Sequence, residues 1–370
     1  MPDQLKPKYF SNLDALRSIA CLIVLFAHTV ELTNLRLSSK ESPGVTSFFL
    51  NGGNGVQIFF TLSGFLITYL LLHEESVRLK VSVGNFYMRR ILRIWPMYFF
   101  TLAIAFGAYP LLKKILDQDL SWRYEKIFHF LFLSNFDIYH AEKFFPGQDA
   151  AIVDITWSVS IEEQFYLLWP VILVTPWLKR MRLYIMGLLA LIAVGFQVNN
   201  HNDPMLNYYS TWSCALNLIC GGLLAYLTFD YIQEKRTLHI PCSVNLAVYA
   251  TIGIIVIWQP FSIDYLIYRW FLLLAVLYVI LDQTINKRCI FSIGKIPVLK
   301  DFSKLTYSVY LVHPMVQLAV IQTLRLFHIA STPMVEWVKF ISIILLSIAA
   351  SILTYIVIEK RFLGLKSRFA

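Results

Sequence analysis

The sequence predicts an all-α protein of the polytopic membrane class, a bundle of about ten transmembrane helices that forms a single domain over residues 1–370. Hydrophobic residues make up 57% of the chain, charged residues only 15%, and the mean hydropathy is +0.60. A soluble protein of this length needs far less apolar surface. The apolar residues also gather in runs long enough to cross about 30 Å of hydrocarbon. Together these observations predict an integral membrane protein.

Each predicted span is a run of about 20 apolar residues. The ten runs lie near 13–32, 55–72, 91–109, 155–175, 183–199, 211–229, 244–260, 264–281, 305–325 and 336–358. Polar or proline-containing stretches such as NNHNDP and FHIASTP separate them. The first run is too long and too charged for a cleaved signal peptide, so we expect it to remain as a helix.

Charge in the loops predicts the topology. Basic residues cluster in alternate loops, and the positive-inside rule places these clusters and both termini in the cytoplasm. This requires residues 110–154 to begin and end outside, so the short apolar run at 127–136 would be re-entrant or interfacial. An eleven-span topology remains open. We interpret the net charge of +9 as a topology signal, with no nucleic acid as partner.

The cysteines show no pattern of metal ligands. They are odd in number and fall mostly in or beside apolar runs, at Cys21, Cys214, Cys220, Cys242 and Cys289. Such cysteines are typical packing residues. We therefore expect no metal site.

Two ionisable residues, Arg17 and His28, lie inside the first apolar run, LDALRSIACLIVLFAHTV. Burying such groups in hydrocarbon costs several kcal/mol and usually marks a function. Eleven residues correspond to about 1100°, so both side chains share a helix face, about 16 Å apart. Alternatively, His28 makes a helix-packing hydrogen bond and Arg17 anchors the helix at the interface.

A pair of carboxylates in the fourth predicted span, TWSVSIEEQFYLLWP, is expected at the depth of His28. If that helix enters from outside near residue 155, Glu162 and Glu163 lie about 10 Å below the outer boundary. A carboxylate there would orient His28 as a general base. The two glutamates are about 100° apart, so only one can face His28. Ser158 and Ser160 could stabilise an oxyanion or serve only in packing.

An arginine cluster, RRILRIWPMYFF, leads into the third span. Arg89, Arg90 and Arg93 lie on the same side of the membrane as Arg17. Guanidinium groups match phosphate oxygens bidentately, although the cluster could equally bind anionic lipid headgroups. A phosphate site joined by one helix to His28 suits acyl-coenzyme A, with its nucleotide and pantetheine arm.

These motifs resemble the acyltransferase-3 family of integral membrane acyltransferases, over nearly the whole chain. The family's first-helix pattern falls on Arg17 and His28, and its arginine-rich motif ends at Pro96 and Tyr98. Four further strings agree with the family's motifs and with their order in the chain: GVQIFFTLSGFLI, TWSVSIEEQFYLLWP, TYSVYLVHP and IEKRF. They include the possible supporting residues Tyr310, His313 and Glu359. Lys360 and Pro314 depart from the family's usual residues.

The resemblance implies an enzyme that moves an acyl group, most often acetyl, from cytoplasmic acyl-coenzyme A to a hydroxyl of a glycan or lipid-linked sugar outside. His28 would be catalytic, with Arg17, Arg89, Arg90, Arg93 and Tyr98 at the donor. No fused hydrolase-like domain is expected after Glu359. A transporter or flippase of the same glycans is the alternative, since intramembrane charges also mark substrate pathways. The sequence leaves open the identity of the acceptor and of the acyl group. It also leaves open whether transfer is direct or passes through an acyl-histidine intermediate, and whether the protein is an oligomer such as a homodimer.

Overall fold

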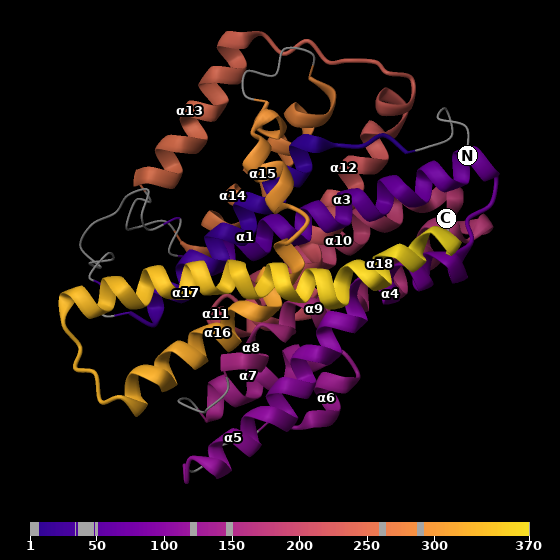
Figure 1. The fold of residues 1–370 in the computed structure, drawn as a ribbon. Coiled ribbons are helices and arrows are strands. Elements are labelled where there is room, and N and C mark those ends of the chain that lie inside the picture. Colours follow the sequence, from indigo (N-terminus) through magenta and orange to yellow (C-terminus); the bar gives the residue numbers. More distant parts are fainter. Residues whose placement is uncertain are drawn as a thin grey trace.

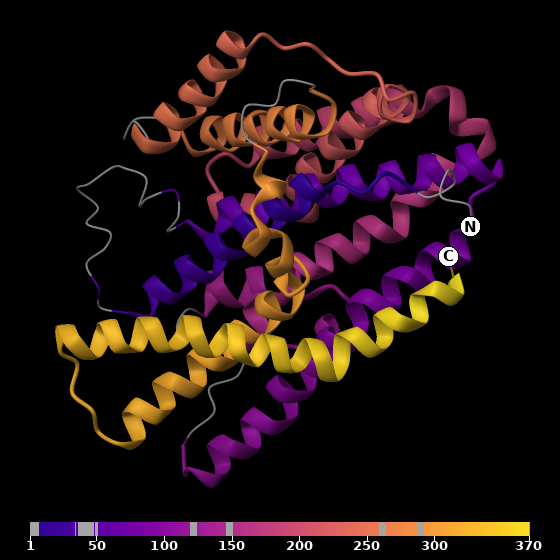
Figure 2. The same ribbon diagram turned by 45° about the horizontal axis from the view of Figure 1, so that its top comes forward.

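The protein is a helical bundle in the computed structural model, which describes residues 7–33, 35, 48, 51–118, 124–145, 151–258, 264–286 and 292–369. These residues form helices and no strand, apart from one isolated bridge between Leu238 and Asn286. The predicted all-α class is thereby confirmed. The long helices run side by side, and α4 (Val83–Ala103) and α18 (Lys360–Leu365) meet near the C-terminus, at the right of Figures 1 and 2.

Eight segments of the described chain are long and apolar enough to cross a membrane. They are α1 (Ser11–Glu31), α3 (Gly52–Arg78), α4 through α5 (Val83–Ile115), the segment ending in α10 (Pro176–Asn199), α12 (Thr211–Gln233), α14 (Tyr265–Ile285), α16 (Thr306–Leu326) and the segment beginning with α17 (Pro333–Phe369). All eight coincide with predicted spans. The protein is therefore an integral membrane protein of the polytopic class.

Two of the ten predicted spans do not reach this length and apolarity. The helix α9 (Thr156–Val174) carries polar residues in its first half, and α13 (Cys242–Trp258) has an apolar stretch of only Cys242–Val256. Figure 2 shows α13 at the edge of the bundle, where Asn245 donates a hydrogen bond of 2.9 Å to Asp282 of α14. The count of ten spans stays a prediction.

The short apolar run at 127–136 is divided between two helices. One is α6 (Lys126–Phe130) and the other is α7 (Ser134–Phe144), with Phe132 between them at a φ of 56°. Neither helix is long enough to span a membrane. The one-turn helix α8 (Ala151–Asp154) then leads directly into α9. This segment sets how deep in the bundle α9 begins.

The last predicted span continues as one long helical segment. It comprises α17 (Pro333–Thr354), a π-helical turn (Tyr355–Glu359), α18 (Lys360–Leu365) and a 3₁₀ turn (Lys366–Phe369). Lys360 keeps its backbone N–H, unlike a proline, so the helix can continue through this position. The final turn thus reaches α4, where Arg89 donates a hydrogen bond of 2.7 Å to the carbonyl of Phe369.

The close contact of α3 with α12 depends on two glycines. A Cβ added to Gly64 would lie 1.9 Å from the carbonyl oxygen of Leu218, and one added to Gly221 would lie 2.0 Å from that of Thr61. Both neighbours are backbone atoms and cannot rotate away. Small residues allow this approach of membrane helices.

Gly64→Ala is expected to destabilise the fold by about 3 kcal/mol, the upper end of overpacking effects, because two helix backbones must separate. The measurement is the apparent melting temperature of the purified protein in detergent. Gly195→Ala in α10 is the matched control, because its added Cβ meets no atom within 4 Å. Equal melting temperatures for the two variants would show that α3 and α12 are not in this contact.

Candidate functional site

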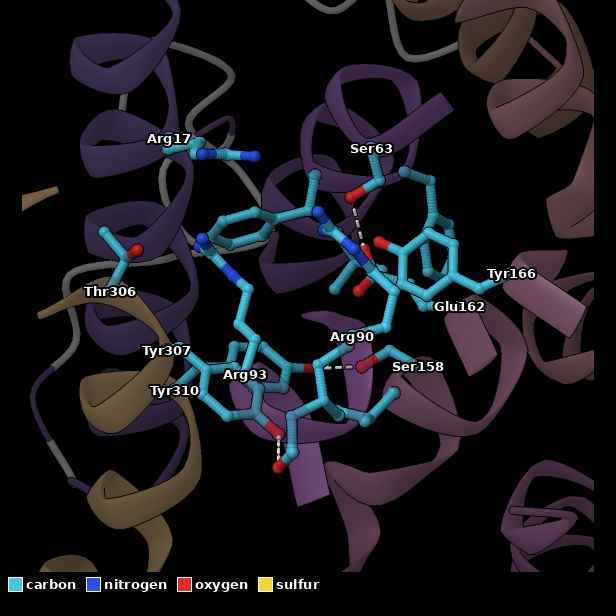
Figure 3. Close-up of a pocket in the computed structure, with 15 residues that line it drawn as sticks. Arg17, Ser63, Arg90, Arg93, Ser158, Glu162, Tyr166, Thr306, Tyr307 and Tyr310 are labelled. Atoms are coloured by element: carbon cyan, nitrogen blue, oxygen red, sulfur yellow. Dashed lines mark hydrogen bonds between the residues drawn. The ribbon is translucent and has the colours of Figure 1, made fainter. Parts of the chain in front are cut away.

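A pocket lies in the middle of the bundle between α1, α3, α4, α9 and α16 (Figure 3). Its polar lining comes from all five helices and consists of Arg17, Ser63, Arg90, Arg93, Ser158, Glu162, Tyr166, Thr306, Tyr307 and Tyr310. We call it the central pocket.

Three arginines at one end of the central pocket have unused donors. Among the described residues, Arg17 forms one ion pair, a long one of 3.5 Å with Asp14. Arg90 stacks near Phe86 and Tyr166, and its Nε atom is buried with no partner among the described residues. Figure 3 shows the side chains of Arg17, Arg90 and Arg93 reaching into the same region. Guanidinium groups left free in this way are ready to bind an anion.

The fourth predicted arginine, Arg89, is already paired. Its Nη2 donates to Glu74 at 2.7 Å, and its Nη1 donates to the Phe369 carbonyl. We therefore assign Arg89 a structural contact between α3, α4 and the C-terminal turn. This separates it from Arg90 and Arg93, which the sequence placed in one group.

A second hollow continues from the arginines toward the ends of the chain. It shares Arg17, Ser63, Arg90, Arg93 and Tyr166 with the central pocket. Its charged lining is mostly basic, with Lys8, Arg17, Arg90, Arg93, Lys304 and Lys366 against Asp14 and Glu359. An excess of cations around one hollow attracts a polyanionic ligand. We call this side of the bundle the arginine end.

The opposite side of the central pocket leads to a pair of histidines. The hydroxyl groups of Tyr310 and Ser158 lie 2.6 Å apart in its wall. His313 follows Tyr310 by one turn of α16, and its Nε2 lies 2.9 Å from Nδ1 of His28. The two rings are stacked, with centroids 5.2 Å apart. We call this side the histidine end.

Hydrogen bonding fixes the tautomers of the neutral pair. Nδ1 of His313 lies 3.0 Å from the carbonyl oxygen of Val309, which can only accept, so this nitrogen carries the proton. Nε2 of His313 then accepts from Nδ1 of His28. Nε2 of His28 is left with a free lone pair, the form required of a base or nucleophile.

Pro314 follows His313 directly and is compatible with this orientation of its side chain. Proline has no N–H, so it cannot donate to the carbonyl four residues earlier and loosens the helix there. The His313 side chain, fully buried, uses the carbonyl of Val309 in the same turn. The departure of this chain from the family pattern at Pro314 is therefore compatible with a functional His313.

The predicted contact between His28 and a glutamate does not occur among the described residues. Glu162 accepts a hydrogen bond of 2.6 Å from Ser63, and Glu163 accepts one of 3.1 Å from Trp95. Glu162 lies instead with the arginines of the central pocket (Figure 3). The expectation that one of the glutamates orients His28 is corrected, because the residue hydrogen-bonded to His28 is His313.

The depth of α9 explains the difference. The sequence argument started this helix at the outer boundary, but α8 and α9 begin inside the bundle, where Ser158 is already level with Tyr310. Glu162 follows Ser158 by four residues, about 6 Å, and Tyr310 precedes His313 by about 4.5 Å. Glu162 is therefore about 10 Å from the histidine pair along the bundle.

Three other predicted residues lie around the site without facing the central pocket. Ser160 is hydrogen-bonded to Ser134 at 2.7 Å, and the Tyr98 hydroxyl donates to the carbonyl of His129 at 2.8 Å. Tyr98 follows Arg93 by five residues and so points about 140° away from it. Glu359 is buried, accepts from Ser308 at 2.7 Å and lines the hollow at the arginine end.

Some lining residues were not assigned from the sequence. Lys304 and Lys366 were counted only as positive-inside charges, and Ser63 and Tyr166 were not singled out. Ser63 and Tyr166 had a usable signal, because they lie within the family-like strings GVQIFFTLSGFLI and TWSVSIEEQFYLLWP. Among the described residues, no group of three His, Cys, Asp or Glu side chains could hold a metal ion, and the four described cysteines are unpaired. Cys289 lies outside the described residues.

The fold and the site define a polytopic membrane protein with a buried polar pocket, which has three arginines at one end and reaches the turn before an imidazole pair at the other. The chain belongs to the acyltransferase-3 family, since the model of this family, described as an acyltransferase domain, matches residues 10–356. This confirms the resemblance drawn from the motifs. No solved structure gives a significant match.

Two curated relatives are named as peptidoglycan O-acetyltransferases, one of them as a candidate. The chain is 28% identical over 322 residues to the peptidoglycan O-acetyltransferase OatA of Listeria monocytogenes serovar 1/2a, covering 83% of this chain and 49% of that protein. It is 28% identical over 274 residues, 66% of this chain and 39% of the relative, to YrhL of Bacillus subtilis strain 168, named a candidate peptidoglycan O-acetyltransferase. The chain thus spans at most about half the length of these relatives.

Proposed function

We propose that the protein is a membrane-bound O-acyltransferase. It moves an acyl group, acetyl first among the candidates, from acyl-coenzyme A bound at the arginine end to a hydroxyl of a glycan at the histidine end. The observation that carries this proposal is the central pocket, which joins Arg17, Arg90 and Arg93 to the turn before the His28–His313 pair. The arginine end is assigned to the cytoplasm of a bacterial inner membrane.

The donor fits the charge and the length of the site. Coenzyme A carries phosphates at one end and its thioester at the end of a narrow pantetheine arm. The basic residues of the arginine end would hold the phosphates, as guanidinium and ammonium groups do in proteins. Arg17 and His28 are eleven residues apart on α1, or about 16 Å, which the arm can reach across.

The chemistry follows from the free lone pair of His28. Nε2 takes the proton of the acceptor hydroxyl while that oxygen attacks the thioester carbonyl; the carbon–sulfur bond breaks and the coenzyme A thiolate leaves with a proton. In the other route, Nε2 attacks the thioester carbonyl, the carbon–sulfur bond breaks and the coenzyme A thiolate leaves. The acceptor hydroxyl then attacks the acyl-histidine, the acyl–nitrogen bond breaks, and the hydroxyl proton passes to the thiolate. His313 stabilises the positive charge that His28 gains in either route.

The acceptor class is taken from the relatives. Their names point to peptidoglycan, so we assign a glycan of the cell envelope, free or lipid-linked, as the acceptor. The glycan hydroxyl would approach from the histidine end, away from the coenzyme.

A transfer assay tests the function. Purified protein in lipid nanodiscs is incubated with acetyl-coenzyme A labelled in the acetyl group and with the disaccharide of N-acetylglucosamine and N-acetylmuramic acid. We expect label in the sugar and one free coenzyme A thiol for each label transferred. Passage of an unmodified fluorescent glycan across protein-containing liposomes, with no thiol released, would identify a flippase instead.

A further inference from the structure

A second pocket lies at the histidine end, apart from the donor side. It is formed by the beginnings of α3, α9, α12 and α14 and by the short helix α11 (Pro204–Tyr209). It shares only Val56 and Phe60 with the central pocket, so these two side chains stand between the two spaces. We call it the outer pocket.

The outer pocket lies beside the first turn of α3, which contacts His28. Gly53 lines it, and the neighbouring Gly52 faces His28 so closely that an added Cβ would lie 3.3 Å from Nε2. A ligand in this pocket is therefore separated from His28 by a helix start without side chains. The donor approaches the same ring from the other side, past Tyr310.

The walls of the outer pocket suit a sugar. Five aromatic side chains line it, from Phe60, Trp157, Tyr208, Tyr265 and Tyr268. Aromatic faces pack on the apolar faces of pyranose rings, and phenol hydroxyls bond with sugar hydroxyls. The ring centroids of Trp157 and Tyr208 lie 4.8 Å apart, so these two form one continuous wall.

Gln57 offers an unused hydrogen-bond acceptor in this pocket. Its side chain is 7% exposed, and its Oε1 atom is buried with no partner among the described residues. A buried carbonyl oxygen without a donor costs about 1–3 kcal/mol. A ligand that brings a hydroxyl or amide N–H to Gln57 removes this cost.

Arg269 gives the outer pocket a positive charge. Its Nη1 donates to the carbonyl of Asn207 at 2.9 Å, which fixes the guanidinium at the pocket wall. Asp264, five residues earlier, is bonded to His201 at 2.5 Å instead. No carboxylate of the described residues lies within ion-pair distance of Arg269.

We infer that the outer pocket is the acceptor site and that it selects a glycan carrying an anionic group, a carboxylate or a phosphate, which pairs with Arg269. Gln57 accepts a hydrogen bond from the same sugar, and the aromatic wall holds its ring. The role of this glycan as the acceptor rests on the proposed function. Its binding to the outer pocket requires neither acyl-coenzyme A nor the transfer reaction.

The test is therefore a binding measurement without acyl-coenzyme A. Protein in nanodiscs is titrated with three probes: the disaccharide of N-acetylglucosamine and N-acetylmuramic acid, which carries a carboxylate; di-N-acetylchitobiose, its neutral counterpart; and N-acetylglucosamine 1-phosphate. We expect at least one anionic probe to bind about tenfold more tightly than the neutral one, the gain of one charge-assisted hydrogen bond. The better anionic probe identifies the natural anion as carboxylate or phosphate.

Variants connect the binding to the residues. Arg269→Gln is expected to remove the anionic preference, Arg269→Lys to keep part of it, and Gln57→Leu to weaken all probes about equally. Arg325→Gln is the matched control, because Arg325 is exposed near the end of α16 and outside the pocket. Equal binding of the neutral and anionic probes, or an unchanged preference in Arg269→Gln, would overturn the inference. His28→Asn should bind the three probes as tightly as the unaltered protein does. A failure of the transfer assay would therefore leave the binding result valid.

Discussion

His28→Ala is expected to reduce acyl transfer by about 10³-fold, within the range by which a positioned general base accelerates a reaction. The loss should appear in kcat, because the imidazole acts on the reacting hydroxyl and makes no contact that binds the coenzyme's phosphates. The measurement is the rate of thiol release from acetyl-coenzyme A with the glycan present. The protein should still insert and fold, because His28 is partly exposed and its replacement by alanine removes no large, fully buried side chain.

Thr29→Val is the control for this prediction. Thr29 is buried in the same turn of α1, and its hydroxyl bonds only to the carbonyl of Leu25 at 2.6 Å. It should retain near-normal turnover. Turnover of His28→Ala within tenfold of the unaltered protein would remove His28 from the mechanism.

The same assay examines the role of His313 as a positioning residue. His313→Ala leaves Nδ1 of His28 without its acceptor, so both tautomers of His28 become available and the rate should fall by about 10²-fold. His313→Gln offers an amide oxygen to Nδ1 and should recover part of the rate. A merely structural His313 would give equal losses in the two variants and no change in the pH profile of kcat.

Arg90→Gln and Arg93→Gln are each expected to raise the KM for acyl-coenzyme A by at least tenfold with a smaller change in kcat. A hydrogen bond to a charged group contributes about 1.5–3 kcal/mol, and the phosphates are bound equally in the ground and transition states. The KM of the unaltered protein should also rise with salt, because ionic contacts are screened. The KM for the glycan should stay unchanged.

Arg89→Gln separates donor binding from helix packing. Its guanidinium is paired with Glu74 and the Phe369 carbonyl, so its replacement should lower the apparent melting temperature and leave the KM for acyl-coenzyme A nearly unchanged. All three variants lose one positive charge on the same helix. A larger KM effect from Arg89 than from Arg90 and Arg93 would contradict the assignment of donor contacts.

Much of the site could be predicted from the sequence because it depends on single helices. Arg17 and His28 share a face of α1 by helix periodicity, and Arg90 and Arg93 share a face of α4 in the same way. Runs of apolar residues placed the long helices, because the thickness of the hydrocarbon sets their length. The motif order also pointed to the correct family.

The partner of His28 could not be predicted in this way. It depends on how far α9 and α16 are shifted along the bundle relative to α1, and nothing in a helix's own sequence sets that shift. The short helices α6 to α8 start α9 well inside the bundle, which moves Glu162 to the arginines and leaves the place beside His28 to His313.

The sequence by itself thus determined the membrane class, the helices and the faces that carry Arg17 and His28, because apolar length and helical period are local properties. Only the tertiary structure decided which of four similar arginines are free, which residue touches His28, and that a second pocket with Arg269 lies behind Gly52. These contacts arise between helices far apart in the chain, where packing between backbones sets the register.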